Sequence, residues 1–594
     1  MILSRPQHAL RVGTALATAL TATALLVPQA QAGPPVDPAV AASFTRTNID
    51  PSITGAAFTV TGPVFGAEKN LVTSGFGTFM FGAPTGGGTL QVYRPGGNVG
   101  VWDKVTVFGT GANIVTPNQP TIADVDGDSD NDLIVPGGYF FDTYDPPGPA
   151  VPQSRGSLTW WENTGPSRAF VRHDVIPPVQ PWAYHGAEFA DLDGDGHKDL
   201  LTVGEQGVDP STPTDDLVQM QLFPGNGDGT FDAPVPIAST GGSLPVVHDV
   251  NDDGRLDIVS AQYFGFPTGP AAVAMPSYRW YEQTGVIAPG GLTSANFTPH
   301  TIATFGQTAN GFQIKPVPNF HGDGKLGWVA TNHLSKLGPG GAFLPASESV
   351  YELTPGADKA QPWALTTLSN PSDPADKMAA RAAAGSAAPG VLGYGDIDGD
   401  GDVDLAVSGD GDELVVGTCQ ASNTCARRLF WIEQKAGGAF VQHTLTGPSE
   451  RFGQAGGAVV ADLDGDGDNE LAFSSFEQNT LAIWTRQGGG PAMVTSTVTG
   501  FKTKTAKVHA GQKIKDTIKV TPGPAREVVL QFRTCGPADD SCSWKTYETY
   551  TSNPGNAVKL RYAAKGKQSW WRVLVEATPQ QSEATSGVRK VKLK

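Results

Sequence analysis

The sequence has few cysteines and histidines, and this scarcity limits the chemistry open to it. Its 594 residues include 4 Cys and 10 His. The cysteines fall as two close pairs, and no histidine or further cysteine pair lies at the spacing of zinc ligands. We therefore favour local disulfide bonds of an oxidising compartment over a zinc site. No nucleophile elbow or phosphate-binding loop occurs either. The expected bonds are Cys419–Cys425 and Cys535–Cys542.

Long apolar runs are also scarce. One run of about 16 residues, Val12 to Val27, follows two arginines. After it, Ala30-Gln-Ala32 stands directly before Gly33. The run is shorter than the about 20 residues of a spanning helix, and the small residues after it are typical of signal-peptide cleavage. No later run is long enough to cross a bilayer. We expect a signal peptide at 1–32, a linker at 33–57 and a protein that is secreted or held at the cell surface.

The chain shows no convincing amphipathic helix, but it is rich in Gly (74) and Pro (47), which separate many short apolar strands. This pattern predicts an all-β protein. The net charge is −17, and its sign changes along the chain. Residues 501–594 hold 18 Lys or Arg against 7 Asp or Glu, whereas the part before them is acidic. We therefore place a domain boundary at residue 500.

The basic part has the alternating strands of a small β-sandwich, similar in pattern to the Ig-like or fibronectin-like modules of secreted bacterial proteins. Its lysines favour either docking on an anionic cell-wall polymer or a solvated surface with no partner. Nucleic acid is a poor partner for this chain, because the signal peptide exports it and the basic residues are not interleaved with aromatics in one motif.

Acidic loops recur before apolar strands and are the strongest signal in the chain. Clustered carboxylates repel one another unless a cation lies among them, and hard oxygen ligands at loop positions 1, 3, 5 and 9 suit calcium. A solvated turn is the alternative that this repulsion disfavours. About five structural Ca²⁺ sites are predicted from the loops. Their acidic and amide residues are Asp124, Asp126, Asp128, Asp130, Asp132; Asp191, Asp193, Asp195, Asp199; Asp249, Asn251, Asp253, Asp257; Asp396, Asp398, Asp400, Asp402, Asp404; and Asp462, Asp464, Asp466, Asp468, Glu470.

A sixth copy at 319–327 has diverged at its ligand positions. His321 replaces the aspartate at position 3, and Gly327 offers no carboxylate at position 9. We predict that this loop binds no metal.

The loops begin about 60 to 75 residues apart, which is the length of a four-stranded unit. Each is followed by an apolar strand and then by an aromatic one, and a further aromatic strand, Leu90–Tyr93, lies upstream without an acidic loop. We predict a seven-bladed β-propeller with calcium loops over 58–500. Six or eight blades are the alternatives, with the first unit completed by the C-terminal strand of the repeats.

The loop D-x-D-G-D-x-x-x-D before an apolar strand resembles the FG-GAP/VCBS repeat of integrin α-subunit propellers and of many secreted bacterial proteins. The resemblance covers roughly residues 58 to 500 and rests on five near-complete loops. It implies that calcium loops join the first two strands of each blade, while ligands dock on the opposite face. The residues that this places on the ligand face are Tyr139, Phe140, Trp182, Tyr184, His185, Tyr263, Phe264, Asn332 and Asp410.

Three functions remain open from the sequence. Aromatic rings beside amides and carboxylates favour a monomeric binding protein for an extracellular glycan or protein. A sugar lyase or dehydratase is the second, since some relatives with such repeats act on sugars; its candidates are His185, Glu205 and His333. A surface spacer without a ligand is the third. Each ring on these loops has an equally ordinary role in packing against its neighbours.

Overall fold

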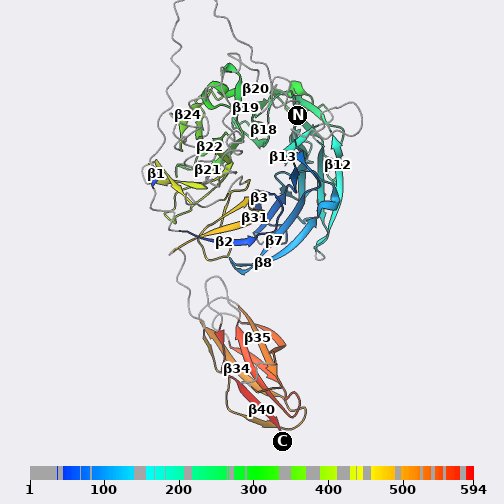
Figure 1. Ribbon diagram of the computed structural model, residues 1–594, viewed down its shortest axis with the longest axis vertical. Helices are drawn as coiled ribbons and strands as arrows, with labels where there is room; N and C mark the ends of the chain where they lie inside the picture. The colour runs from blue at the N-terminus through cyan, green and yellow to red at the C-terminus, as the bar shows by residue number, and fades with distance from the viewer. Residues whose placement is uncertain are drawn as a thin grey trace, which may run out of the picture.

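The structure is a computed structural model, and nearly all of its regular elements are β-strands (Figure 1). It describes residues 36–37, 44–66, 69–80, 83–139, 155–165, 168–180, 182–206, 217–263, 265, 273–287, 291–332, 349–369, 388–410, 429–435, 438–445, 452, 456–487, 497–521, 526–536, 542–552, 557–575 and 584–594. The described helices are one α-helical turn, α1 (Phe305–Thr308), and two short 3-10 turns. The all-β prediction is confirmed.

Successive stretches of the chain up to Arg486 form antiparallel sheets of four strands each, one extended by the short parallel strand β1 (Val36–Asp37). The first three, here sheets 1 to 3, are β3 (Ala56–Gly62), β4 (Asn70–Gly75), β7 (Thr89–Asn98), β8 (Val101–Phe108); β9 (Thr121–Ala123), β10 (Asp132–Gly137), β11 (Gly156–Asn163), β12 (Phe170–Gln180); and β13 (Ala183–Ala190), β14 (Asp199–Gln206), β15 (Leu217–Phe223), β16 (Val235–Ala238).

The remaining four sheets follow the same order. Sheets 4 and 5 are β17 (Val246–His248), β18 (Asp257–Ala261), β19 (Pro276–Gln283), β20 (Phe297–Thr304); and β21 (Gln313–Pro318), β22 (Leu326–Thr331), β23 (Val350–Thr354), β24 (Ala364–Thr367). Sheets 6 and 7 are β25 (Ala388–Gly395), β26 (Asp404–Asp410), β27 (Phe430–Lys435), β28 (Ala439–Thr444); and β29 (Val459–Ala461), β30 (Glu470–Ser475), β31 (Thr480–Arg486), β2 (Phe44–Asp50).

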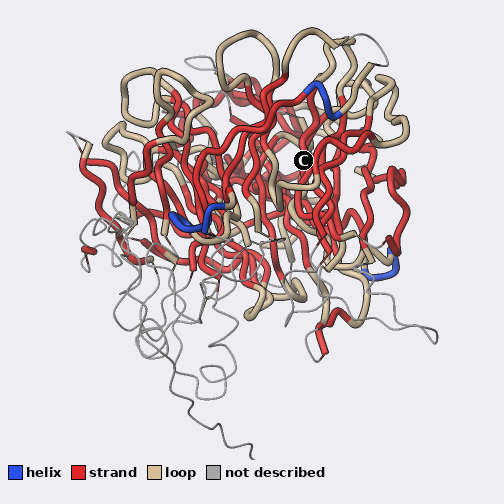
Figure 2. The backbone as a smooth tube through the Cα atoms, turned by 90° about the horizontal axis from the view of Figure 1, so that it is seen from above, coloured by secondary structure: helices blue, strands red, loops and turns tan. Residues whose placement is uncertain are grey.

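The sheets stand around a common centre, which makes the arrangement propeller-like (Figure 1). First strands of sheets 1, 5, 6 and 7 contribute to one cavity of about 380 Å³, so the first strand of a sheet is the inner one. Seen from above, the strands occupy a middle layer and many described loops gather along one face (Figure 2). The acidic loops and the ligand-face loops therefore join opposite ends of the strands.

The last sheet is closed by the N-terminal strand rather than by the C-terminal one. β2 pairs antiparallel with β31, with Thr45 opposite Thr485 and Asn48 opposite Ala482. The structure differs here from the linker predicted at 33–57, because Phe44–Asp50 belongs to the ring of sheets. This pairing of distant segments joins the two ends of the ring. Without β2, sheet 7 would lack its fourth strand.

The aromatic strands lie in the sheets because their rings fill the space between neighbouring sheets. Trp161 of β11 packs with the first-sheet core and stacks on Phe108 at 4.6 Å between ring centroids. Trp484 of β31 packs with Trp431 of β27 in one buried cluster. Burial of rings of this size is the main source of stability for such contacts. Each predicted apolar and aromatic strand overlaps a strand of the structure.

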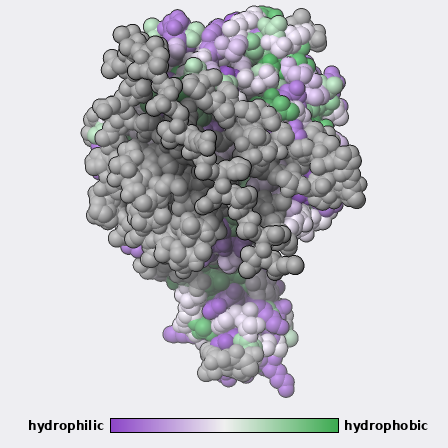
Figure 3. All heavy atoms as spheres, turned by 45° about the horizontal axis from the view of Figure 1, so that its top comes forward, coloured by the Kyte–Doolittle hydropathy of each residue, from purple (hydrophilic) through white to green (hydrophobic). Residues whose placement is uncertain are grey.

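The C-terminal region forms separate sheets around its own core (Figure 1). Trp571, Tyr562 and Leu530 are among its fully buried side chains. A disulfide joins Cys535 to Cys542, as predicted, whereas Cys419 and Cys425 lie outside the described residues. The described surface of this lower body shows many hydrophilic side chains (Figure 3). Its strands are β32 (Thr497–Thr499), β33 (Ala506–Val508), β34 (Ile514–Thr521), β35 (Arg526–Arg533), β36 (Lys545–Ser552), β37 (Val558–Tyr562), β38 (Gln568–Val575), β39 (Ala584–Thr585) and β40 (Arg589–Leu593).

Within the described part of the chain, none of the helices has the length and apolar character that a membrane span requires.

Candidate metal centre

Every acidic loop joins the first strand of a sheet to the second. The loop that starts at Asp124 links β9 to β10, and the diverged loop at 319–327 links β21 to β22 in the same way. The other loops do so in sheets 3, 4, 6 and 7. The loops therefore occupy equivalent places at one end of successive sheets.

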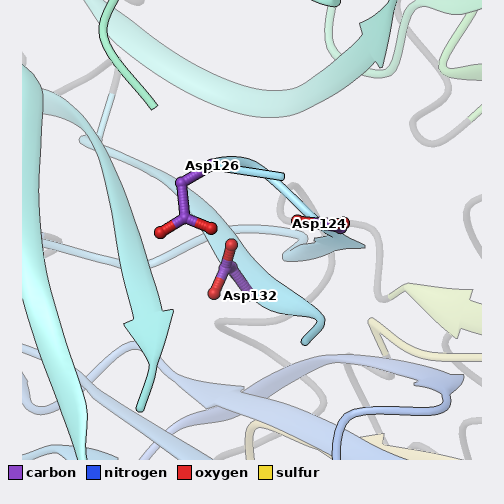
Figure 4. A group of neighbouring side chains, drawn as sticks. All are labelled: Asp124, Asp126 and Asp132. Atoms are coloured by element: carbon purple, nitrogen blue, oxygen red, sulfur yellow. The ribbon is translucent and has the colours of Figure 1, made fainter. Parts of the chain in front are cut away.

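Backbone N–H groups hold the carboxylates of the first loop in a fixed order. Asp124 accepts hydrogen bonds from Gly127 N at 2.8 Å and Ser129 N at 3.1 Å. The buried Asp132 accepts from Val125 N at 2.9 Å and from Asn163 N at 2.8 Å, through different oxygens. Asp126 and Asp132 turn their carboxylates toward one another (Figure 4). The same bonds to the first and last aspartates recur in the loops at 191 and 396. The loop at 249 keeps them except that Asp253 N, at position 5, replaces the donor at position 4.

Positions 4 and 6 give these loops their tight curl. Both have positive φ in the loop at 191–199, at 76° for Gly194 and 95° for Gly196. Glycine adopts this backbone conformation without a steric penalty. The first loop places Ser129 there with φ 76°, and the loop at 249 places Asp252 there with φ 62°. The curl therefore persists where glycine is absent.

The loops bring like charges together. Oxygens of Asp124, Asp126 and Asp132 lie within 4.8 Å of one another, and so do those of the matching residues in the loops at 191, 396 and 462. Burial raises the pKa of Asp132, Asp199 and Asp257 to about 6, and that of Asp404 and Glu470 to about 8. A cation among them would reverse this effect by stabilising the charged form.

Two basic side chains approach the loop at 249–257. Arg255 forms an ion pair with Asp253, and Lys359 contacts Asp252 at 2.7 Å. Position 3 is Asn251, so positions 1, 3, 5 and 9 hold three carboxylates instead of the four in the loops at 124, 191, 396 and 462. These groups offset part of the negative charge, and we expect a weaker metal site here.

The diverged loop keeps the curl but not the ligands. Asn319 accepts a hydrogen bond from Gly324 N at 2.7 Å, as Asp124 does from the equivalent residue of its loop. His321 contacts Glu352 of β23 at 2.6 Å, and Lys325 contacts Asp323 at 3.2 Å. The loop geometry is thus retained with basic side chains beside its acids.

The donor set of the other loops fits a hard divalent cation. It consists of carboxylate oxygens and the amide oxygen of Asn251, with no thiolate or imidazole among the loop ligands, which suits calcium or magnesium. In the loop at 462, Glu470 is fully buried and its Oε1 has no hydrogen-bond partner among the residues that the structure describes. An unpartnered buried carboxylate oxygen costs free energy unless a cation or water takes it. A metal ion at this loop would supply that partner.

The predicted ligand-face residues divide into buried and half-buried groups. Tyr184, His185, Tyr263 and Asn332 are buried, while Tyr139 and Trp182 are half-buried. Asn332 is held by a bond to Thr308 O at 3.1 Å and by one from Ser349 N at 2.8 Å. Asp410 ends β26; Phe140, Phe264 and His333 lie outside the described residues. Ligand contact stays a prediction for these side chains.

His185 and Glu205 meet inside sheet 3. His185 Nδ1 lies 2.8 Å from Glu205 Oε2, and Ser243 N donates to Glu205 Oε1 at 3.2 Å. Glu205 is fully buried and His185 is 7% exposed. The carboxylate holds the imidazole ring in place and links β13 to β14. This contact stabilises the sheet and leaves little ring surface for a substrate.

Tyr139, a predicted ligand-face residue, belongs to an aromatic cluster whose Phe76 and Phe79 the sequence did not point to. The cluster lies on the face opposite the acidic loops. Phe79 lies on a small hairpin of β5 (Phe79–Met80) and β6 (Ala83–Pro84), within the connection between β4 and β7. Its ring contacts Tyr139 at 5.3 Å and Phe476 at 5.4 Å between centroids, and Phe76 contacts Phe476 at 6.1 Å. All four rings are half-buried. They come from the connections between second and third strands of sheets 1, 2 and 7.

Two charged side chains near the central cavity, Lys315 and Glu188, were not among the predicted site residues. Lys315 of β21 lines the central cavity and donates to Leu392 O at 2.8 Å. Burial lowers the pKa of Lys315 to about 8 and raises that of Glu188, on β13, to about 7. Each charge in turn favours the ionised state of the other.

Residues 396–473 match the FG-GAP-like repeat, so this part of the chain carries that repeat. Similar solved structures are the "exotype rhamnogalacturonan lyase YesX" (14% identity, TM-score 0.39, 75% of this chain and 72% of that one) and the Bacillus licheniformis "Rhamnogalacturonan Lyase PL11" (13%, 0.36, 77% and 74%). A Trypanosoma rangeli sialidase has 10% identity and a TM-score of 0.32 over 88% and 83%. No curated protein matches.

Proposed function

We propose that this chain is a secreted, calcium-stabilised, seven-bladed β-propeller that binds an extracellular glycan on the face opposite its acidic loops. The seven sheets would be the blades, and the acidic loops of sheets 2, 3, 4, 6 and 7 would each hold one calcium ion. The apolar N-terminal run would direct export, and the basic C-terminal domain would serve as a tether to anionic wall polymers.

The aromatic cluster of Phe76, Phe79, Tyr139 and Phe476 carries the glycan proposal. Its rings are only half-buried, whereas rings of a hydrophobic core would be fully enclosed. They come together from the connections of three different sheets. Aromatic faces stack on the C–H surfaces of sugars, while nearby polar groups fix hydroxyls. Thr78 and Thr85, both exposed and joined by a 2.6 Å hydrogen bond, lie on the same hairpin and offer such groups.

Binding to a glycan array in calcium tests the proposal. Phe79→Ala and Tyr139→Ala should each weaken binding about tenfold, since one stacked ring is worth about 1 kcal/mol or more. Phe231→Ala is the matched control, because Phe231 is a half-buried ring in the hairpin between β15 and β16, at the opposite end of the strands. It should bind like the parent protein.

Each alternative gives a different result. Saturable binding that survives both substitutions would move the ligand site away from the cluster and refute the proposal. Binding to a protein but to no glycan would keep the aromatic cluster as the site and change the proposed ligand from a glycan to a protein. Turnover of a polysaccharide that is lost in His185→Ala would favour the lyase hypothesis instead.

A further inference from the structure

Sheets 2, 4 and 6 share a motif that is separate from their acidic loops. Their third strands contain Trp-x-Glu followed by an amide, at Trp160–Asn163, Trp280–Gln283 and Trp431–Gln434. In each, a histidine on the fourth strand lies directly opposite the tryptophan: His173, His300 and His443. At the position of this glutamate, sheets 3 and 7 have Pro224 and Thr485. The motif is thus confined to alternate sheets.

The histidine holds the glutamate of its motif in place. In sheet 4, the His300 ring stacks on Trp280 at 4.6 Å, and its Nε2 lies 2.8 Å from Glu282 Oε2. Sheet 2 has the same arrangement, with 4.1 Å between the rings and 2.8 Å to Glu162. Sheet 6 repeats it with His443, Trp431 and Glu433. A ring held by stacking restricts the rotamers open to the carboxylate.

The amide that follows the glutamate fixes the backbone at this point. In sheet 6, Gln434 N donates to Asp404 at 2.9 Å, and the Gln434 side chain donates to Phe320 O in the loop of sheet 5 at 2.7 Å. Gln283 reaches Leu192 O in the loop of sheet 3 at 2.9 Å. The third strand is therefore pinned to its own loop and to the preceding one.

Each glutamate faces position 3 of its own acidic loop. Oxygens of Glu433, Asp398 and Asp400 lie within 4.8 Å of one another. In sheet 4, Asn251 donates to Glu282 Oε1 at 3.0 Å. In sheet 2, Glu162 occupies the same register position, directly after Trp161, which lies opposite Leu133. Three strands thus add a carboxylate to a place that is already acidic.

The diverged sheet 5 provides an internal comparison. There position 3 is His321, and its Nε2 contacts Glu352 of the third strand at 2.6 Å. Glu352 lies opposite Val329, two residues before the position of the motif glutamates and on the same face of the strand. In the sheet whose loop has lost its ligands, a nitrogen donor meets the third-strand carboxylate. In sheets 4 and 6 the third-strand carboxylate meets its own histidine and also the acidic loop, at Asn251 or at Asp398 and Asp400, and Lys435 contacts Glu433 as well.

From these contacts, and resting on the calcium loops of the proposed function, we infer that Glu162, Glu282 and Glu433 are metal ligands supplied from the third strand. His173, His300 and His443 are their positioning residues. The metal sites of sheets 2, 4 and 6 would then differ in kind from those of sheets 3 and 7, which are built from the loop alone. A fifth side-chain ligand, added to those at positions 1, 3, 5 and 9, suits calcium, which accepts six to eight oxygen ligands.

Calcium titration of the full chain against a chromophoric chelator tests this inference. Glu433→Gln keeps the shape of the side chain and removes its charge, and it should weaken one site about tenfold or more while the others remain. Glu282→Gln should do the same in sheet 4. Glu352→Gln, in the sheet without loop ligands, is the matched control and should leave the number and affinity of the sites unchanged. Circular dichroism in calcium verifies the fold of each variant.

The outcomes separate this inference from the proposal beneath it. Calcium binding by the parent protein with an unchanged isotherm for both Glu433→Gln and Glu282→Gln would overturn the third-strand ligands and leave the loop sites intact. A parent protein that binds no calcium would overturn both. An equal loss in Glu352→Gln would show that any third-strand charge acts at a distance, and it would also refute direct ligation.

Discussion

Replacing Asp132, the last aspartate of the first acidic loop, tests how that loop is held together. Its carboxylate is fully buried and accepts hydrogen bonds from Val125 N and Asn163 N at 2.9 and 2.8 Å. Asp132→Ala leaves both N–H groups without an acceptor, at a cost of about 1–3 kcal/mol each, so we expect a loss of about 4 kcal/mol in calcium. For a body of about 440 residues this corresponds to a fall in Tm of about 4 °C.

The assay is thermal unfolding followed by tryptophan fluorescence, in excess calcium and in EGTA at pH 7.5. Asp130→Ala is the control, because Asp130 is exposed at position 7 of the same loop, outside the ligand positions 1, 3, 5 and 9, and a change within about 0.5 kcal/mol is expected for it. In EGTA, Asp132→Ala should cost less than in calcium, because the pKa of Asp132 is raised to about 6 by burial and its charge is unfavourable there. Equal losses for Asp132→Ala and Asp130→Ala in calcium would refute the reasoning.

Two further perturbations follow from the same contacts. In EGTA, the Tm of the ring of sheets should fall as the pH rises from about 4 to 8. Protonation of Asp132, Asp404 and Glu470 favours the folded state below their raised pKa values of about 6, 8 and 8, and this stabilisation is lost as they ionise. Excess calcium should remove the trend, and a Tm that rises with pH in EGTA would contradict the reasoning. Joint replacement of Cys535 and Cys542 by alanine should cost about 2 kcal/mol, since the bond closes a short loop with a sequence separation of 7. Calorimetry should show this loss in the C-terminal transition alone, and a shift of the larger transition would be evidence against two independent bodies.

The loops and the strands after them were predictable because their signals are local. Carboxylates at positions 1, 3, 5 and 9 are fixed by spacing within nine residues, and the structure places each such loop between a first and a second strand. The register of a strand such as β10 then follows from its apolar residues, since side chains alternate along a strand. Neither inference needs a contact with a distant part of the chain.

Closure of the ring was not predictable in the same way. Phe44–Asp50 follows a Pro- and Ala-rich stretch and has no acidic loop, so composition favoured a linker. Its place as the outer strand of sheet 7 depends on hydrogen bonds to residues more than 400 positions away, such as Thr485. Local periodicity carries no information about which free edge a strand will pair with.

The ligand face was the hardest part to predict, because strand ends decide exposure there. Tyr184 was assigned to a loop, but β13 begins at Ala183, so the ring points into the sheet stack and is 1% exposed. Phe79 escaped notice because the connection between β4 and β7 has no acidic loop to mark its sheet. Its exposure results from the β5–β6 hairpin, which only the three-dimensional structure reveals.

The acidic loops are tied to one another as well as to their own sheets, and this affects how metal binding acts on the fold. Asn131 of the first loop donates to Pro63 O of sheet 1 at 2.7 Å, and Asn469 donates to Asp396 O of the sheet 6 loop at 2.7 Å. Together with the side-chain bonds of Gln283 to Leu192 O and of Gln434 to Phe320 O, these bonds join sheet 1 to 2, 3 to 4, 5 to 6 and 6 to 7. The loop of sheet 6 has such bonds on both sides, from Asn469 and through Gln434, and β2 makes the ring continuous. Loss of a cation there should weaken the contacts with sheets 5 and 7. Metal removal should therefore act on the whole ring in one transition rather than on single sheets.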